Sequence, residues 1–314
     1  MRHSRKLLNG KEQAVRFLFA LSALFSLAAL AIITVFLLAN GIPFIREYGF
    51  GKFIFGTKWA PLRDTPLYGI FPMIVTTLYV TALSVIIGVG VGLLTAVCLY
   101  RFCPRRLVSP IRQMINLLAG IPSVIFGLFG MTVIVPFVRD YISPTGVGYG
   151  IFSSSLVLAV MVLPTVVSVS LDSLSAVPAT YYEGALALGA TDSEAAFKIV
   201  LPAAKSGIMS GVVLAIGRAL GETMAVILVV GGSPEMPKSI FQSVRTLTAN
   251  IAMGAMELDD NTVSALVASG VVLFVFALLL NVSFSLLKKS KSESAERRKR
   301  NDPKNSKATA SGKT

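Results

Sequence analysis

Charge is scarce in this chain. Only 14% of its 314 residues are charged and 54% are hydrophobic, whereas a soluble domain carries about 25% charged residues. Histidine and cysteine are scarcer still, with one histidine (His3) and two cysteines (Cys98 and Cys103). This shortage excludes a metal site of the His/Cys type and a Ser-His-Asp or Cys-His catalytic arrangement. We also expect no disulfide, because we place both cysteines on the reducing side of a membrane.

Long apolar runs take the place of the missing charge. Unbroken blocks of about 20 residues are typical of helices that cross a bilayer about 30 Å thick. The alternating periods of about ten residues that mark a transmembrane β-barrel are not visible. We therefore predict an all-α, polytopic membrane protein with six transmembrane helices, at 17–39, 70–99, 113–138, 151–171, 206–232 and 263–287.

The first apolar block follows a basic N-terminus (1–16), as the core of a signal peptide would. Its apolar core is longer than the roughly 7–15 residues of a signal peptide. Residues 40–43, Asn-Gly-Ile-Pro, predict a turn rather than a cleavage site. We therefore predict an uncleaved extra helix and an outer loop within 17–69, followed by a core at 70–287.

Basic residues gather on one side of the predicted membrane. They are concentrated in the N-terminus, in the link 101–112 and in the tail 288–314, whereas acids balance them in the opposite links. Positive charge stays on the cytoplasmic side, so both termini are predicted to be cytoplasmic. The net charge of +13 is then mainly a topology signal, and we expect a lipid bilayer and no nucleic acid as its partner. The tail is rich in Ser, Lys and Arg and is predicted to be disordered.

The chain ends on Ser311–Thr314, Ser-Gly-Lys-Thr, which looks like the end of a nucleotide-binding P-loop. That motif requires a glycine where this chain has Lys307, and a helix must follow it. We therefore expect ATP to be hydrolysed by another polypeptide.

The link between the fourth and fifth blocks contains two predicted capping boxes, Thr180–Glu183 and Thr191–Glu194. In each box, a hydroxyl and a carboxylate bind free amides at a helix start. Gly189 between them fits a helix end with positive φ, and the second helix is predicted to end near Leu201-Pro202. These signals predict two short helices outside the membrane, at 180–202, which we call the elbow.

The elbow resembles the EAA motif of ABC importer permeases: EAA, three residues, Gly, nine residues, then I-x-L-P. In that family the elbow sits in a groove of the ATPase subunit, so the resemblance implies a type I ABC importer permease fold with ATP and Mg bound by the partner. An ordinary capped hairpin, with Glu183 serving only as a cap, is the competing interpretation. The matching residues are Glu183, Gly184 (where the motif has Ala), Ala185, Gly189, Ile199, Leu201 and Pro202.

The fifth apolar block contains Arg218 and Glu222. A charge near the middle of a span costs roughly 2.5–3.5 kcal/mol, and the i,i+4 spacing places both groups on one helix face. Two interpretations remain open. The residues form a structural ion pair, or Arg218 lines a pathway and binds a tetrahedral oxyanion while Glu222 orients it and limits the affinity.

The segment 217–225, Gly-Arg-Ala-Leu-Gly-Glu-Thr-Met-Ala, resembles PstC-type phosphate permeases, in which an Arg and a Glu at these positions are implicated in phosphate passage. The resemblance covers about residues 17–287. It implies a subunit of the bacterial inner membrane that forms half of the translocation pathway of an ATP-driven phosphate importer and performs no covalent chemistry. The implied partners are a PstA-type permease, two ATPase subunits and a periplasmic phosphate-binding protein. Other similar segments are 55–61, 68–72, 121–130 and 247–252.

Three alternatives stay open at this point: a permease for another oxyanion such as molybdate or sulfate, a membrane scaffold for phosphate signalling, and a passive channel. The elbow argues against the channel, which needs no ATPase. The outer link 233–262 carries apolar residues near helical spacing, from Ile240 to Leu247. We expect it to lie along the membrane surface or to contact a binding protein.

Overall fold

The structure, a computed structural model, describes residues 2–254 and 260–300. In this part of the chain, helices dominate and five are long and apolar enough to cross a membrane. A sixth candidate is a bent pair, Asp192–Ala203 and Lys205–Gly221, whose two halves meet at 70°. The prediction of an all-α membrane fold is confirmed. The five spanning segments are Val15–Tyr48, Phe71–Phe102, Ser123–Ile142, Ile151–Ser175 and Asp260–Ser283.

The only sheet in the described part is a short antiparallel hairpin, in which Trp59 pairs with Tyr68 and Ala60 with Leu67. Segments labelled η are π-helical. The elements are α1 (Arg2–Tyr48), α2 (Phe50–Phe55), β1 (Trp59–Ala60), β2 (Leu67–Tyr68), α3 (Phe71–Val97), η1 (Cys98–Phe102), α4 (Arg105–Ala119), α5 (Ser123–Phe129), η2 (Gly130–Ile134), α6 (Val135–Phe137), η3 (Val138–Ile142), α7 (Ile151–Ser175), α8 (Ala179–Ala187), α9 (Asp192–Glu194), η4 (Ala195–Val200), α10 (Leu201–Ala203), α11 (Lys205–Gly221), α12 (Met224–Ile227), α13 (Leu247–Gly254) and α14 (Asp260–Arg300).

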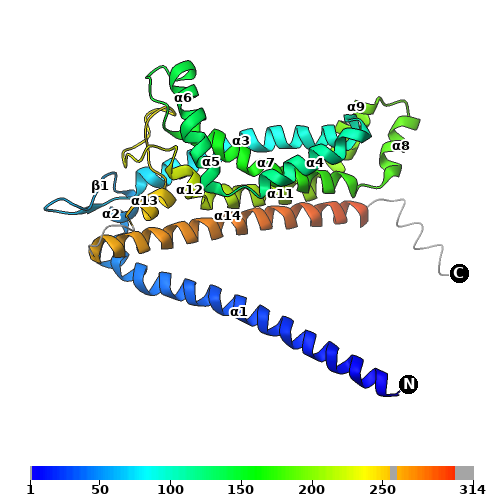
Figure 1. The fold of residues 1–314 in the computed structure, drawn as a ribbon, viewed down its shortest axis with the longest axis horizontal. Coiled ribbons are helices and arrows are strands. Elements are labelled where there is room, and N and C mark those ends of the chain that lie inside the picture. Colours follow the sequence, from blue (N-terminus) through cyan, green and yellow to red (C-terminus); the bar gives the residue numbers. More distant parts are fainter. Residues whose placement is uncertain (1, 255–259, 301–314) are drawn as a thin grey trace.

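The helices α3, α7, α11 and α14 run side by side, while α1 leaves the bundle at an angle (Figure 1). The elbow helices α8 and α9 lie at one end of this bundle, and α2, β1 and α13 lie at the other (Figure 1). The first turns of α1 and the last turns of α14 extend toward the end that carries the elbow. Both described ends of the chain therefore lie toward the same side as the elbow.

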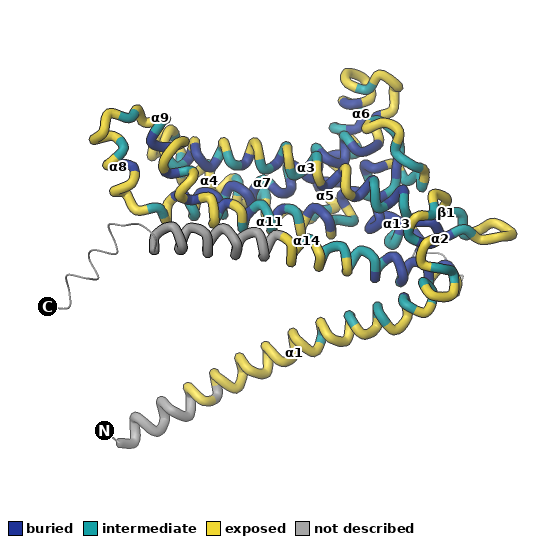
Figure 2. Tube along the Cα trace, turned by 180° about the vertical axis from the view of Figure 1, so that it is seen from behind, coloured by how far each residue is buried: buried dark blue, intermediate teal, exposed yellow. Residues whose placement is uncertain are grey.

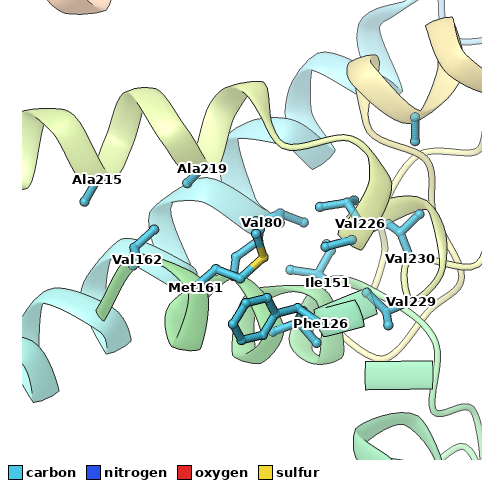
Figure 3. Close-up of a cluster of buried hydrophobic side chains, with 14 of the residues drawn as sticks. Val80, Phe126, Ile151, Met161, Val162, Ala215, Ala219, Val226, Val229 and Val230 are labelled. Carbon is cyan, nitrogen blue, oxygen red and sulfur yellow. The ribbon is translucent and has the colours of Figure 1, made fainter. Parts of the chain in front are cut away.

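The main core is apolar and lies where α3, α5, α7, α11 and α12 meet (Figure 3). Glycines let these helices approach closely, as small residues do in membranes. A Cβ on Gly88 of α3 would lie 2.5 Å from Val162 Cγ2, and one on Gly127 of α5 would lie 2.9 Å from Ala225 Cα. The core includes Val80, Phe126, Ile151, Met161, Val162, Ala215, Ala219, Val226, Val229 and Val230.

Most of α1 is exposed, as Figure 2 shows, and its side chains are largely apolar. It touches α14 near Gly41, where a Cβ would lie 2.5 Å from Val271 Cγ2. The turn that we predicted at 40–43 is wrong, because the helix continues through Pro43 to Tyr48. Aromatic packing of the following turn explains this: the Phe44 ring lies 5.3 Å from that of Tyr68, between centroids. This contact keeps the chain in line with the helix.

Two other predicted boundaries are wrong. The third predicted span, 113–138, is divided between α4 and α5, because Pro122 is extended (φ −57°, ψ 139°) and starts a new helix. At the other end of the chain, α14 continues to Arg300, so the first part of the tail that we predicted to be disordered is helical. The rest of that tail, 301–314, lies outside the described residues.

The link 233–262, whose apolar residues are near helical spacing, is not helical before Leu247. Val244 is fully buried, its N–H binds the Val230 carbonyl at 3.0 Å, and its carbonyl accepts the Gly232 N–H at 2.8 Å. A helix begins only at Leu247, which is itself buried. Val244 and Leu247 therefore pack into the core, whereas Ile240 is 44% exposed. A contact of this link with the membrane surface or with a binding protein stays a prediction.

Candidate functional site

The elbow has the shape that its sequence predicts, with α8, a turn at Gly189 (φ +88°) and a second helix that starts at α9. The capping box at Thr191–Glu194 is formed: the Glu194 N–H binds Thr191 Oγ1 at 3.3 Å and the Thr191 N–H binds Glu194 Oε2 at 3.2 Å. The box predicted at Thr180–Glu183 is not formed. Pro178 starts α8 earlier, so Thr180 falls inside the first turn and no side chain caps that helix.

Glu194 holds the second half of the elbow in place. Lys198 Nζ donates to its carboxylate at 2.9 Å, and the Thr191 backbone and hydroxyl groups bind the same carboxylate. These donors, with Lys198 the largest cause, lower the pKa of Glu194 from 4.5 to about 2. The cap is therefore charged throughout the physiological range.

The outer surface of the elbow is uncovered and partly apolar. Leu188, at the turn, is 91% exposed, and Tyr181 and Phe197 are also exposed. Apolar side chains gathered on a surface indicate a contact with another protein. The motif residues Glu183, Gly184, Gly189, Ile199 and Pro202 are exposed, whereas Ala185 and Leu201 are half-buried.

The inner surface of the elbow packs against the bundle. Tyr182 and Val200 of the elbow share a buried cluster with Leu99 of η1, Leu171 of α7 and Ile208 of α11. The elbow thus contacts the ends of three spans and can pass a displacement into them.

Arg218 lies in the last turn of α11 and is exposed. A neighbouring face of the same helix carries Ala215 and Ala219 into the buried core (Figure 3). Beside Arg218, the exposed glycines Gly217 and Gly221 leave open space, since a Cβ on either would meet nothing within 4 Å. The arginine therefore stands on a face of α11 that this chain leaves uncovered.

The helix breaks directly after this arginine. Glu222 has an extended backbone (φ −71°, ψ 128°), and its Oε1 accepts the N–H of Ala225 at 3.2 Å, at the start of α12. Thr248 Oγ1 of α13 donates to the Glu222 carbonyl at 3.0 Å. Broken backbone at membrane depth is tolerated where protein buries it or where it lines a water-filled cavity. The half-buried Glu222, one turn from the uncovered Arg218, fits such a boundary.

The predicted span 206–232 is therefore not one helix, and Arg218 lies at a helix end rather than near a helix middle. Arg218 makes no ion pair within the described part of the chain. An ion pair between Arg218 and Glu222 is not formed in the described residues, because the helix ends at Gly221 and the i,i+4 geometry is lost. The carboxylate of Glu222 instead caps α12. A structural bridge from either residue to a partner helix stays a prediction.

Basic side chains also line two cavities at the end of the bundle opposite the elbow. A cavity of about 520 Å³ is lined by Lys58, Arg63 and Lys238, together with Glu235. A neighbouring cavity of about 280 Å³ is lined by Arg63 and Arg245. Sequence reasoning missed these sites, because counting charge over whole links does not show which basic residues of different links come together.

Comparisons with known proteins identify the family to which this chain belongs. The sequence pattern of the family described as "Binding-protein-dependent transport system inner membrane component" matches residues 88–292. The chain belongs to this family. The permease is 34% identical to the phosphate transport system permease protein PstC of Mesorhizobium japonicum, over 82% of this chain and 84% of the relative. It is 35% identical to the probable ABC transporter permease protein YqgH of Bacillus subtilis, over 84% of this chain and 86% of the relative.

Solved structures agree on the fold. The permease matches a chain of the MetNI methionine ABC transporter with a TM-score of 0.54 at 20% identity, covering 68% of this chain and 92% of that one. It also matches a chain of a bacterial alginate ABC transporter with a TM-score of 0.56 at 17% identity, covering 83% and 92%. The permease therefore has the type I ABC importer fold. As an inner-membrane subunit of this family, it works with an ATPase and a substrate-binding protein and is not itself an enzyme.

Proposed function

We propose that this permease is the PstC-type subunit of an ATP-driven phosphate importer and forms half of its translocation pathway. The observation that carries the proposal is Arg218, an exposed arginine without an ion pair in the described residues, at the break of a spanning helix. Relatives more than 30% identical over most of the chain are named as phosphate permeases, which supports phosphate as the anion.

The geometry around Arg218 suits a tetrahedral oxyanion. A guanidinium presents a planar fork of donors that matches two oxygens of such an anion. Gly217 and Gly221 leave room for the anion beside the fork. The carboxylate of Glu222, just beyond the helix break, adds negative charge to this region, and its repulsion keeps the anion from binding too tightly to leave.

The uncovered face of α11 is the contact with the second permease, of the PstA type. An arginine facing acyl chains would cost roughly 2.5–3.5 kcal/mol even on insertion scales. A second permease opposite Gly217, Arg218 and Gly221 removes that cost and completes a polar pathway between the two subunits.

The elbow is the contact with the ATPases, two of which bind ATP and Mg on the cytoplasmic side. The exposed Leu188, Tyr181 and Phe197 fit a groove in such a partner, with Glu183 at the rim. Both described ends of the chain extend toward the elbow, so both termini are cytoplasmic in this arrangement, in agreement with their basic residues.

The opposite end of the bundle is then periplasmic and receives a phosphate-binding protein. The basic cavities there, lined by Lys58, Arg63 and Lys238, raise the local concentration of an anion released above them.

Competition of uptake tests the substrate. The complete importer is reconstituted in proteoliposomes with ATP inside, and uptake of radiolabelled phosphate is measured with excess arsenate, molybdate or sulfate. We expect arsenate alone to compete, because it shares the charge and size of phosphate. Competition by molybdate or sulfate would indicate a permease for another oxyanion, and uptake without ATP would indicate a channel. An ATP-hydrolysing complex that moves no anion at all would favour the signalling scaffold.

A further inference from the structure

Three side chains meet between the elbow and the end of α3. Arg101 Nε donates a hydrogen bond to Tyr182 Oη at 2.6 Å, and the Tyr182 hydroxyl donates to the carboxylate of Asp192. Arg101 Nη2 lies 3.3 Å from the same Asp192 carboxylate oxygen. The Arg101 guanidinium carbon also lies 4.3 Å from the centroid of the Tyr182 ring. One arginine thus binds a hydroxyl, an aromatic face and a carboxylate.

The three residues belong to three different elements. Arg101 lies in η1, which continues α3, Tyr182 lies in α8, and Asp192 is the first residue of α9. The two elbow residues stand on either side of the turn at Gly189. Their shared contact with Arg101 therefore sets the angle between the two elbow helices and also their position on the end of α3.

Packing alone does not set this position. Tyr182 is 8% exposed and belongs to the buried cluster that includes Leu99 and Val200. A cavity of about 220 Å³ is nevertheless lined by Tyr182, together with Arg101, Glu183 and others. A side chain next to such a space can shift, so the directional polar contacts decide where the tyrosine lies.

The contact is suited to fixing a position rather than to adding stability. The side chains of Arg101 and Asp192 are 43% and 63% exposed, and ion pairs as exposed as this one contribute little to stability. The planar fork of an arginine nevertheless defines the direction of each partner. Hydrogen bonds from Tyr182 and then Arg101 lower the pKa of Asp192, so its carboxylate is charged in the cytoplasm.

We infer that Arg101, Tyr182 and Asp192 form a latch that makes the elbow and α3 move together when the ATPase displaces the elbow. The inference rests on the proposed coupling role of the elbow. The elbow is joined covalently to α11 through a 70° bend, whereas α3 is distant in sequence and reaches the elbow only through contacts. The latch residues touch no anion; they position the elbow so that one displacement reaches both spans.

A distance measurement tests the latch without reference to phosphate. Spin labels are placed on the exposed Cys98 of η1 and on Ala187→Cys, an exposed position at the end of α8, in a Cys103→Ser background of the assembled importer. The wild-type distance should be the same with and without ATP. In Tyr182→Phe and Asp192→Asn, ATP should shift or broaden the distribution of distances between the two labels. The latch is refuted by a wild-type distance that changes with ATP, or by variants that behave as the wild type does.

The transport ratio gives the functional test. Phosphate moved per ATP hydrolysed should fall about two- to thirtyfold in Tyr182→Phe and Asp192→Asn, while ATP hydrolysis continues. Tyr182→Phe keeps the ring and its packing, so a folding defect is not expected. The matched control is Arg112→Gln, which breaks an equally exposed bridge, to Asp172 at 2.6 Å, that joins α4 to α7 and includes no elbow residue. An unchanged ratio in the latch variants, or an equal fall in the control, would overturn the inference. A wild-type complex that transports nothing would instead refute the proposed function, and the label distances would still decide the latch.

Discussion

Glu222 caps the helix that follows it: its Oε1 accepts the backbone N–H of Ala225 at 3.2 Å. The break in the fifth span is therefore held by a side chain that the sequence had suggested as an ion-pair partner. One residue combines a structural task, which needs only an acceptor oxygen, with a negative charge near the proposed anion pathway.

These two tasks of Glu222 can be separated by substitution. Glu222→Gln retains an acceptor oxygen and should leave the free energy of unfolding nearly unchanged, whereas Glu222→Ala loses the cap and should cost about 1 kcal/mol. Denaturant unfolding of the permease in lipid micelles measures both. Both variants should alter phosphate uptake, because both lose the charge. Equal stability of the two variants would show that the cap contributes nothing.

The glycines of the elbow should respond in opposite directions to alanine. Gly189 has φ +88°, so Gly189→Ala should cost roughly 1–2 kcal/mol. Gly184 lies inside α8 with nothing within 4 Å of an added Cβ. Gly184→Ala should therefore stabilise the helix by roughly 0.5–1 kcal/mol. The free energies of unfolding of the two variants measure the difference. A destabilising effect of Gly184→Ala would contradict the open environment of Gly184 in the structure.

The capping box should weaken in acid. The pKa of Glu194 is about 2 in the folded protein against 4.5 for the free side chain. Because the folded pKa is the lower one, the contribution of Glu194 is fully present above pH 4.5 and is lost as the pH falls toward 2. Hydrogen exchange of the elbow amides, corrected for intrinsic exchange rates, should show protection that decreases across this window. In Glu194→Gln the protection should be lower and should change less across this window, the remaining change coming from Asp192, whose pKa is also lowered. Equal changes in wild type and Glu194→Gln would contradict the assignment.

The crossing of α1 and α14 depends on Gly41. A Cβ there would lie 3.1 Å from Ala268 Cα and 3.2 Å from the Val267 carbonyl oxygen, so Gly41→Ala forces two backbones apart. We expect a cost of about 1–3 kcal/mol in the free energy of unfolding. Gly51→Ala is the control, because a Cβ on Gly51 of α2 meets nothing within 4 Å. Equal effects of the two substitutions would place α1 away from α14.

The elbow was largely predictable because its signals are local. A glycine with positive φ and the capping box at Thr191–Glu194 act within a few residues, and both are present as the sequence predicts. The box at Thr180 failed because α8 begins at Ala179, with Pro178 at the N-cap, so Thr180 is already the second residue of the helix.

The break at Glu222 was not predictable from hydropathy, because the segment around it remains apolar on both sides. Part of its stabilisation comes from Thr248, which reaches the Glu222 carbonyl from α13. The latch is hidden in the same way, since Arg101 finds Tyr182 and Asp192 only after folding. A count of positive charge treats Arg101 as a topology signal and no more.

The central claim is that Arg218 binds the transported anion. The direct test is uptake of radiolabelled phosphate by the reconstituted importer at saturating ATP, comparing wild type with Arg218→Gln, Arg218→Lys and the control Arg112→Gln. Losing charge-assisted hydrogen bonds to the anion should lower uptake about ten- to hundredfold in Arg218→Gln. Arg218→Lys keeps the charge without the fork of donors, so its uptake should lie between that of wild type and that of Arg218→Gln. The control Arg112→Gln should match wild type. Such a loss, with the complex assembled and its ATPase still stimulated by the binding protein, is the predicted result; unchanged uptake in Arg218→Gln would contradict the account.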